Sequence, residues 1–180
     1  GGKSWAVRVN ALLLAARHPG ISQMIIRRSY PELYANHIKP FLKLLPKGSY
    51  RYNDTKKEIR LPNGSTISFR YCASDKDLDR LQGVEYDVIF LDEATQLSEY
   101  QMRAIVACVR AVNDYPKRVY YTCNPGGKGH GYIKRLFIDR RFTEDEHEED
   151  YAFIQAKVTD NKALMKYQPE YIRSLEKLPP

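Results

Sequence analysis

Short apolar runs alternate with longer segments of helical pattern along this chain of 180 residues. The runs 23–27 and 86–91 are largely continuous rather than alternating, which is typical of strands buried on both faces of a parallel sheet. Strands that alternate with helices predict an α/β domain whose largely parallel sheet is flanked by helices. The length and the apolar fraction of 43% suit one globular domain. Further strands are expected at 118–122 and 151–158, and helices at 5–17, 31–45 with a bend at Pro40, 75–81, 99–112, 132–138 and 164–178.

A β-hairpin is expected in the first half of the chain. Residues 58–61 and 65–71 flank Pro62-Asn63-Gly64, and Asn-Gly between such runs is the strongest short signal for a hairpin turn. The sequence therefore predicts a hairpin around Asn63-Gly64 that is inserted into the α/β domain. The acidic segment 142–150 is interpreted as a solvated loop.

The first four residues, Gly1-Gly2-Lys3-Ser4, match the end of a Walker A loop, which reads G-x-x-x-x-G-K-[ST] and opens a helix. Glycines let backbone N–H groups close around phosphate oxygens, and the helix N-terminus adds partial positive charge. The lysine reaches the β- and γ-phosphates of a nucleotide, and the hydroxyl binds Mg²⁺. A G-K-S tripeptide also arises by chance or as a cloning remnant, so other motifs must support this interpretation.

The strand at 86–91 supports it, because Asp92 and Glu93 follow directly. An apolar strand that ends on two carboxylates is the Walker B pattern, and buried parallel strands deliver their last residues to the sheet edge where ligands bind. Asp92 is predicted to hold Mg²⁺ through its water shell, and Glu93 to orient and deprotonate the attacking water. The simpler alternative is an ordinary strand with a polar end, and the preceding G-K-S helix start argues against it.

A third strand ends on Thr122 and is followed by Cys123-Asn124. Thr122 and Asn124 are predicted to lie beside the Walker B strand and near the γ-phosphate, where a polar residue senses hydrolysis in many P-loop motors. The alternative is a strand-end threonine followed by a turn-forming Asn-Pro-Gly.

In their order and spacing, these motifs resemble the ATPase domain of phage large terminases, the DNA-packaging motors of tailed phages. The resemblance rests on G-G-K-S, the Asn-Gly hairpin, D-R-L-Q-G-V-E-Y-D-V-I-F-L-D-E-A and Y-T-C-N-P, and it runs over nearly the whole chain. It implies a P-loop NTPase fold of the ASCE or RecA-like class that hydrolyses ATP with Mg²⁺. It also implies roles for matching residues: nucleotide binding by Gly1, Gly2, Lys3 and Ser4, Mg²⁺ binding by Ser4 and Asp92, catalysis by Glu93 and Lys3, and coupling by Thr122 and Asn124.

The resemblance further implies partners. These are double-stranded DNA, a portal protein and a small terminase subunit, with the chain working in a homo-oligomeric ring in the host cytoplasm. The formal net charge of +7 favours a polyanionic partner. The longest wholly apolar stretch, 11–16, is far shorter than the ~20 residues that span a bilayer, so no membrane partner is expected.

Parts of the family pattern fall outside the 180 residues. Family members place an adenine-contacting motif upstream of Walker A, a stimulatory arginine within that loop, and a nuclease domain after the ATPase domain. The chain is therefore interpreted as a single, N-terminally truncated ATPase domain whose first P-loop strand is missing. Two neighbouring strands are then expected to have unpaired edges, and the chain to bind ATP poorly or not at all.

Two other functions remain open at this point. Asp92-Glu93-Ala94-Thr95 resembles the D-E-A-D box of helicases, although the third motif is T-C-N rather than S-A-T. Because the Walker A loop is incomplete, the chain could instead be a catalytically inactive nucleic-acid-binding or assembly module.

Several residues allow two interpretations. Arg27 and Arg28 could contact the nucleotide or DNA, or be solvated charges. The glycine-rich segment 126–131 is interpreted as a flexible loop rather than a phosphate cradle, and His130 within it as having no catalytic or metal-binding role. The three cysteines, 72, 108 and 123, are expected to be buried free thiols, because their spacing fits no metal site.

Overall fold

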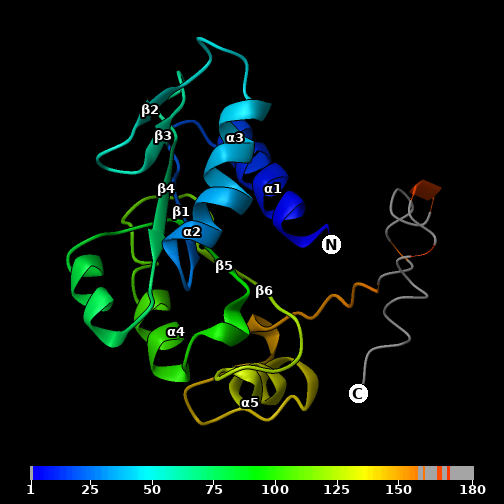
Figure 1. The fold of residues 1–180 in the computed structure, drawn as a ribbon. Helices are drawn as coiled ribbons and strands as arrows, with labels where there is room; N and C mark the ends of the chain where they lie inside the picture. The colour runs from blue at the N-terminus through cyan, green and yellow to red at the C-terminus, as the bar shows by residue number, and fades with distance from the viewer. Residues whose placement is uncertain (1, 158–159, 161–165, 168–169, 171–180) are drawn as a thin grey trace.

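In the computed structural model, which describes residues 2–157, 160, 166–167 and 170, the strands form one continuous sheet in the order β2-β3-β4-β1-β5-β6 (Figure 1). Strands β4, β1, β5 and β6 run parallel, whereas β3 is antiparallel to both of its neighbours. The predicted α/β fold with a largely parallel sheet is therefore confirmed. The strands are β1 (Ser22–Arg27), β2 (Arg51–Asn53), β3 (Glu58–Arg60), β4 (Thr66–Tyr71), β5 (Val88–Asp92) and β6 (Arg118–Thr122).

The predicted hairpin is formed by β3 and β4, with Arg60 paired to Thr66 next to the turn. Gly64 adopts a φ of +85°, a left-handed conformation that costs glycine little. The Asn63 side chain donates from Nδ2 to the carbonyl oxygen of Ala15 at 2.7 Å, which attaches the turn to α1. Because β4 also pairs with β1 over its full length, the hairpin extends the central sheet rather than standing apart from it.

Helices cover both faces of the sheet (Figure 1). Helix α1 and the segment α2-η1-α3 pack on one face, and η2, α4 and α5 pack on the other. Ile25 and Phe90 belong to the first core, whereas Ile26 and Leu91 belong to the second, as the two-residue period of a strand requires. No described helix is long and apolar enough to cross a membrane. The α-helices are α1 (Lys3–Arg17), α2 (Tyr30–Leu33), α3 (Lys39–Leu44), α4 (Glu99–Val106) and α5 (His130–Ile133); the π-helical turns are η1 (Tyr34–Ile38) and η4 (Lys134–Ile138); and the 3₁₀ turns are η2 (Asp75–Leu81), η3 (Ala94–Gln96) and η5 (Glu148–Asp150).

Helix α1 forms because its apolar residues recur at helical spacing. Val7, Ala11 and Leu14 are buried against the sheet. Pro19 and Gly20 follow the last turn; proline cannot continue the helical hydrogen bonds, and Gly20 takes a φ of +92° on the way into β1. The first turn of α1 lies at the edge of the sheet where β5 ends, because Ser4 in that turn contacts Asp92.

The helical segment that contains Pro40 is interrupted in a specific way. Within the π-helical turn η1, the Lys39 amide bonds to the Tyr34 carbonyl five residues back, instead of four. Pro40 has no amide proton, so the carbonyl of Asn36 lacks its usual helical donor and accepts from Nη1 of Arg8 in α1 instead. The expected bend at Pro40 is thus a π-helical turn that is bonded to α1.

Two predicted elements are shorter or absent. The helix expected at 99–112 ends at Val106, because the chain then turns so that the Cys108 carbonyl accepts from the Tyr86 amide at 2.9 Å. The strand expected at 151–158 has no regular structure over 151–157, and residue 158 lies outside the described part. Tyr151 packs its ring on Phe137 and Phe142 instead, and residues 152–157 are exposed. The helix expected at 164–178 lies mostly outside the described residues.

The acidic segment 142–150 is a mostly exposed loop, as predicted, and two of its carboxylates form ion pairs. Arg135 donates from both terminal nitrogens to the Glu146 carboxylate at 2.7 and 2.9 Å, and Arg140 pairs with Glu148 at 2.7 Å. Such two-point contacts are the strong form of an ion pair. The segment is therefore attached to the turn η4 by its charges.

The expected gap between two neighbouring strands is not found among the described residues. Strand β5 pairs with both β1 and β6, and β6 is an edge strand of the described sheet. The three cysteines are free, as predicted, although Cys123 is only half-buried while Cys72 and Cys108 are buried.

Candidate functional site

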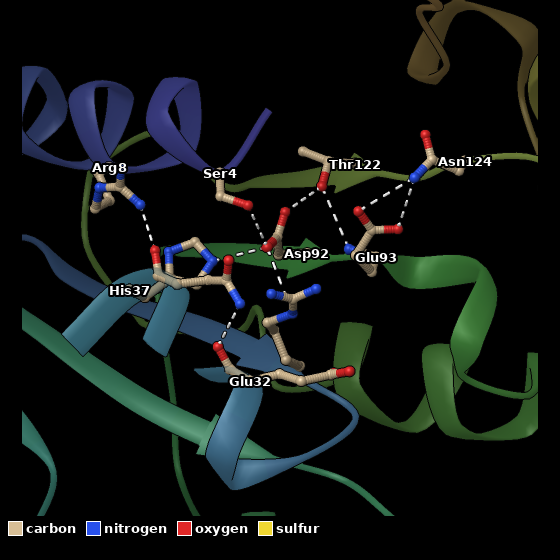
Figure 2. Close-up of polar contacts among 10 residues, drawn as sticks. Ser4, Arg8, Glu32, His37, Asp92, Glu93, Thr122 and Asn124 are labelled. Carbon is tan, nitrogen blue, oxygen red and sulfur yellow. Dashed lines mark hydrogen bonds and ion pairs between the residues drawn. The ribbon is translucent and has the colours of Figure 1, made fainter. Parts of the chain in front are cut away.

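Strands β5 and β6 end side by side at the carboxyl edge of the sheet. Asp92, the last residue of β5, is in register with Thr122, the last residue of β6. Glu93 and Asn124 follow within two residues, and all four side chains meet at this edge (Figure 2). Ligands of α/β proteins bind at this edge. The structure thus brings together the polar residues that the sequence places at the two strand ends.

The first turn of α1 reaches the same place. The Ser4 hydroxyl donates to Oδ2 of Asp92 at 2.9 Å. Gly2 is the N-cap residue, no described side chain caps the helix, and its first turn contains no acidic residue. A helix N-terminus of this kind offers free N–H groups and partial positive charge, which favour an anion such as phosphate. Gly1, the remaining predicted residue of this loop, lies outside the described residues.

Asp92 lies at the centre of these contacts, and its side chain is fully buried. Oδ1 accepts from the Thr122 hydroxyl. Oδ2 accepts from Ser4 and from Nε2 of His37 at 2.8 Å, and Nε of Arg27 is 3.6 Å away. Burial alone would raise the pKa of this carboxyl, but the donated hydrogen bonds, that of His37 first, outweigh it and lower the pKa to about 2. Asp92 is therefore ionised at neutral pH.

His37 is an uncharged donor in this arrangement. Its side chain is fully buried, and burial lowers the pKa of its imidazole, an effect that outweighs the bond to Asp92 and to which Arg8 and Arg27 add. An ionised carboxylate can only accept, so the proton lies on Nε2. Nδ1 is buried and has no hydrogen-bond partner among the described residues.

Glu93 adopts an unusual backbone conformation. Its φ of 57° and ψ of 47° are left-handed, which costs a residue with a side chain about 1–2 kcal/mol. Its amide donates to the Thr122 hydroxyl at 3.3 Å, so Thr122 bridges Asp92 and Glu93. Strained residues of this kind cluster at functional sites.

Asn124 lies between a cation and an anion. Nζ of Lys3 donates to Oδ1 of Asn124 at 2.6 Å, and Nδ2 of Asn124 faces the two Glu93 carboxylate oxygens at 3.4 and 3.5 Å. The backbone carbonyl of Asn124 accepts from the Thr95 hydroxyl at 2.9 Å. One amide side chain therefore links the lysine of α1 to the carboxylate that follows β5.

Two members of the site differ from the sequence interpretation. Arg27 is buried beside Asp92, whereas Arg28 is exposed. The two arginines therefore differ: Arg28 is a solvated charge, and Arg27 lies at the site. His37 was not predicted at all. A single histidine in a helical pattern gives no signal, and only Pro40, three residues later, indicates that the helix is irregular there.

Two glycines of the glycine-rich segment, Gly127 and Gly129, lie close to the backbone of the turn that follows Glu93. A Cβ atom on Gly127 would lie 2.4 Å from the Thr95 carbonyl oxygen, and one on Gly129 would lie 2.4 Å from that of Leu97. The Gly129 amide donates to the Thr95 carbonyl at 2.9 Å, and the Gly126 amide donates to Nδ1 of His130. These glycines therefore permit close contact with the turn that follows Glu93.

The donor set fits Mg²⁺. The Ser4 hydroxyl and the Asp92 carboxylate are hard oxygen donors whose oxygens lie 2.9 Å apart. The described residues contain no group of three or more His, Cys, Asp or Glu side chains that could hold a metal ion. A site of this type takes its remaining ligands from substrate phosphates and water.

Comparison with known proteins identifies a family and a fold for this chain. Over residues 1–180 the sequence matches the family described as terminase large subunit, T4likevirus-type, N-terminal, while a search of curated proteins found no match. The large terminase from a thermophilic bacteriophage superposes with a TM-score of 0.72 at 18% identity, over 94% of this chain and 41% of that one. The complex of that terminase with ATP-γ-S gives 0.71 at 18% identity, over 99% and 42%. The ATPase domain of the large terminase of Thermus phage P74-26 gives 0.61 at 16% identity, over 99% and 79%.

The superpositions and the family match carry different weight. At these identities the superpositions show a shared fold, which is the predicted P-loop fold, and the chain spans 41% of the length of the thermophilic phage protein. The family match spans the entire sequence. On that ground the chain belongs to the N-terminal family of T4likevirus-type terminase large subunits.

Proposed function

We propose that the protein to which this chain belongs hydrolyses ATP to drive double-stranded DNA into a phage procapsid, with this chain supplying the ATPase site. The observation that carries the proposal is the 2.9 Å contact between Ser4, at the start of α1, and Asp92, at the end of β5. It joins a phosphate-binding helix N-terminus to a buried carboxylate, the two halves of a P-loop site. The related proteins include one bound to ATP-γ-S and one called an ATPase domain.

Lys3 and the first turn of α1 bind the triphosphate. Backbone N–H groups at the start of α1 would bind the phosphate oxygens, and Gly1 is proposed from the motif to bind the nucleotide as well. Lys3 reaches the β- and γ-phosphates by exchanging its bond to Asn124 for phosphate oxygens.

Ser4 and Asp92 hold Mg²⁺, Asp92 through a water molecule. When bound there, Mg²⁺ would neutralise charge that develops on the phosphate groups. Because Asp92 is ionised and buried, it supplies a full negative charge at this point without competition from bulk water.

Glu93 is the general base. It orients the attacking water and accepts its proton on a carboxylate oxygen. Its left-handed backbone turns the side chain away from Asp92 and towards Asn124, so the two carboxylates serve separate tasks (Figure 2). Thr122 and Asn124 couple hydrolysis to motion, because Asn124 contacts both Lys3 and Glu93 and its carbonyl is bonded to Thr95.

Partners follow from family membership and charge. We infer that double-stranded DNA is bound mainly through its phosphates, independently of sequence and with a strong salt dependence. The net charge of +7 supports this inference. We further propose that the protein works as a homo-oligomeric ring in the host cytoplasm. Its proposed protein partners are a portal protein and a small terminase subunit.

Binding and hydrolysis measured on the full-length gene product test the proposal. Lys3→Ala should weaken binding of a fluorescent ATP analogue, whereas Glu93→Gln should keep binding within about threefold and lower hydrolysis by about 10²–10⁴-fold. Glu99→Gln, which alters an exposed carboxylate in α4, is the matched control and should change neither. A wild-type protein that neither binds nor hydrolyses ATP would refute the proposal and favour an inactive assembly module. Unimpaired hydrolysis by the Glu93→Gln variant would refute the assignment of Glu93 as the general base.

The helicase alternative is not favoured. The family match covers residues 1–180, which include the Asp92-Glu93-Ala94-Thr95 box on which that alternative rests. DNA unwinding by the gene product without ATP-dependent translocation along a duplex would revive it.

A further inference from the structure

His37 occupies a position that the proposed reaction does not explain. Nucleotide binding, Mg²⁺ binding and water activation are assigned to other residues, yet this imidazole is fully buried and donates to Asp92 at 2.8 Å. It comes from η1, on the helical segment after β1, rather than from either strand of the site.

The local sequence explains why His37 points inward. In a regular α-helix each added residue rotates the side-chain direction by about 100°. The π-helical turn between Tyr34 and Ile38 contains one residue more per turn, so side chains after its start are displaced relative to a regular helix. Turns of this kind are frequent at functional sites. Here the turn faces the sheet with His37 and Ile38, which are both buried, while Asn36 is exposed.

The same turn is bonded to the helix that begins the site. Pro40 leaves the Asn36 carbonyl without a helical donor, and Nη1 of Arg8 donates to it. Arg8 lies one helical turn after Ser4 in α1. The neighbouring residues Asn36 and His37 therefore contact α1 and β5 respectively.

The contacts at Oδ2 of Asp92 give His37 a distinct task. Ser4 also donates to this oxygen, but in the proposed function its hydroxyl is a ligand of Mg²⁺. Thr122 holds the other oxygen, Oδ1. If Ser4 bound Mg²⁺ instead, His37 would be the remaining hydrogen-bond donor to Oδ2 among the described residues, since Arg27 approaches only to 3.6 Å.

We propose that His37 is a positioning residue that holds the Asp92 carboxylate in the orientation required for Mg²⁺-dependent nucleotide binding. This inference rests on the proposed function. A hydrogen-bonded partner of a metal-binding side chain fixes its orientation, and loss of such a partner costs about 10–100-fold in metal affinity or activity.

The test compares two side chains of similar size at position 37. His37→Gln keeps an N–H donor, and His37→Met fills the space without one. The readout is the ratio of dissociation constants for a fluorescent ADP analogue without and with Mg²⁺, measured on the full-length gene product. His37→Met should reduce this ratio by about 10-fold or more, and His37→Gln should stay within about threefold of the wild type.

Asn36→Ala is the matched control, because it alters an exposed side chain of the same turn that does not touch Asp92. It should leave the ratio unchanged. A ratio in His37→Met equal to that of the wild type, or equal losses in the Met and Gln variants, would overturn the inference and reduce His37 to a packing residue. If His37→Met does not fold, His37→Asn, whose shorter amide cannot reach Oδ2, takes its place in the same comparison.

The outcomes separate this inference from the proposed function. A wild-type protein that binds no nucleotide refutes the proposed function. A wild type that binds with Mg²⁺ and a His37→Met variant that does so equally well refute only the role of His37.

Discussion

Replacing Gly127 with alanine tests whether the glycine-rich segment is packed or mobile. Gly127 has a φ of +89°, and an added Cβ would lie 2.4 Å from the carbonyl oxygen of Thr95. Gly126 has a similar φ of +94°, but an added Cβ would meet nothing within 4 Å. The two alanine variants therefore share the cost of a left-handed backbone and differ in the collision.

The expected losses follow from these two terms. An alanine in the left-handed conformation lowers the free energy of unfolding by about 1–2 kcal/mol, and this is the whole loss of stability expected for Gly126→Ala. Collision of the added Cβ with a backbone carbonyl costs a further ~1–3 kcal/mol. The free energy of unfolding of Gly127→Ala should therefore fall by about 2–5 kcal/mol in all. Gly129→Ala meets the Leu97 carbonyl without positive φ and should lose about 1–3 kcal/mol. Gly131→Ala, in α5 with open space around it, should gain about 0.5–1 kcal/mol.

Urea and thermal unfolding measure these differences directly. For a protein of this length, 1 kcal/mol corresponds to a change of about 2–4 °C in Tm. The packed arrangement therefore predicts a melting temperature for Gly127→Ala that is lower than that of Gly126→Ala by several degrees. Equal losses in the two variants would show that the segment moves away from Thr95, and would refute the close contact.

Three further variants test other parts of the structure. Glu93→Gly removes the left-handed strain and should stabilise the protein by about 1–2 kcal/mol in urea unfolding, while hydrolysis falls to background; a loss of stability would contradict this. The bond from Arg135 is the main cause that lowers the pKa of Glu146 from 4.5 to about 2, so its contribution is present above pH 4.5 and is lost as the pH falls towards 2. Glu146→Gln should therefore lower stability by about 1 kcal/mol at pH 7 and by progressively less in acid, whereas Glu149→Gln, at an exposed position of the same segment, should not. Asn63→Ala removes the bond from the hairpin turn to α1 and should cost about 1–2 kcal/mol in urea unfolding without a change in hydrolysis; an equal loss of activity would contradict a purely structural role.

The part of the site that comes from strands could be predicted from the sequence. Asp92 and Thr122 end two apolar runs, and neighbouring parallel strands place their last residues at one edge. Ser4 joined them because a G-K-S sequence opens a helix whose N-terminus faces the same edge. Each of these predictions needed only the spacing of apolar residues, which identifies a strand or helix, and the residue at which that strand or helix ends or begins.

The part that comes from tertiary packing could not be predicted in this way. The glycine-rich sequence 126–131 predicts a flexible loop, because glycine is as typical of free backbone as of close approach, and the backbone opposite Gly127 and Gly129 is known only from the fold. The apolar residues at 151–158 predicted a strand, but Tyr151 found aromatic partners in Phe137 and Phe142 instead. Local pattern identifies what a segment can form, and its neighbours decide between the options.

His37 combines both limits. Pro40 correctly indicated an irregular helix, but a bend and a π-helical turn have the same sequence signal and direct side chains differently. The turn places His37 on Asp92, 55 positions away, where Ser4 and Thr122 also donate to the two carboxylate oxygens. Ser4 is also a proposed metal ligand and Thr122 also accepts from the Glu93 amide, whereas Nδ1 of His37, its other ring nitrogen, has no hydrogen-bond partner among the described residues. An imidazole buried for a single hydrogen bond is explained most directly by the carboxylate that it orients.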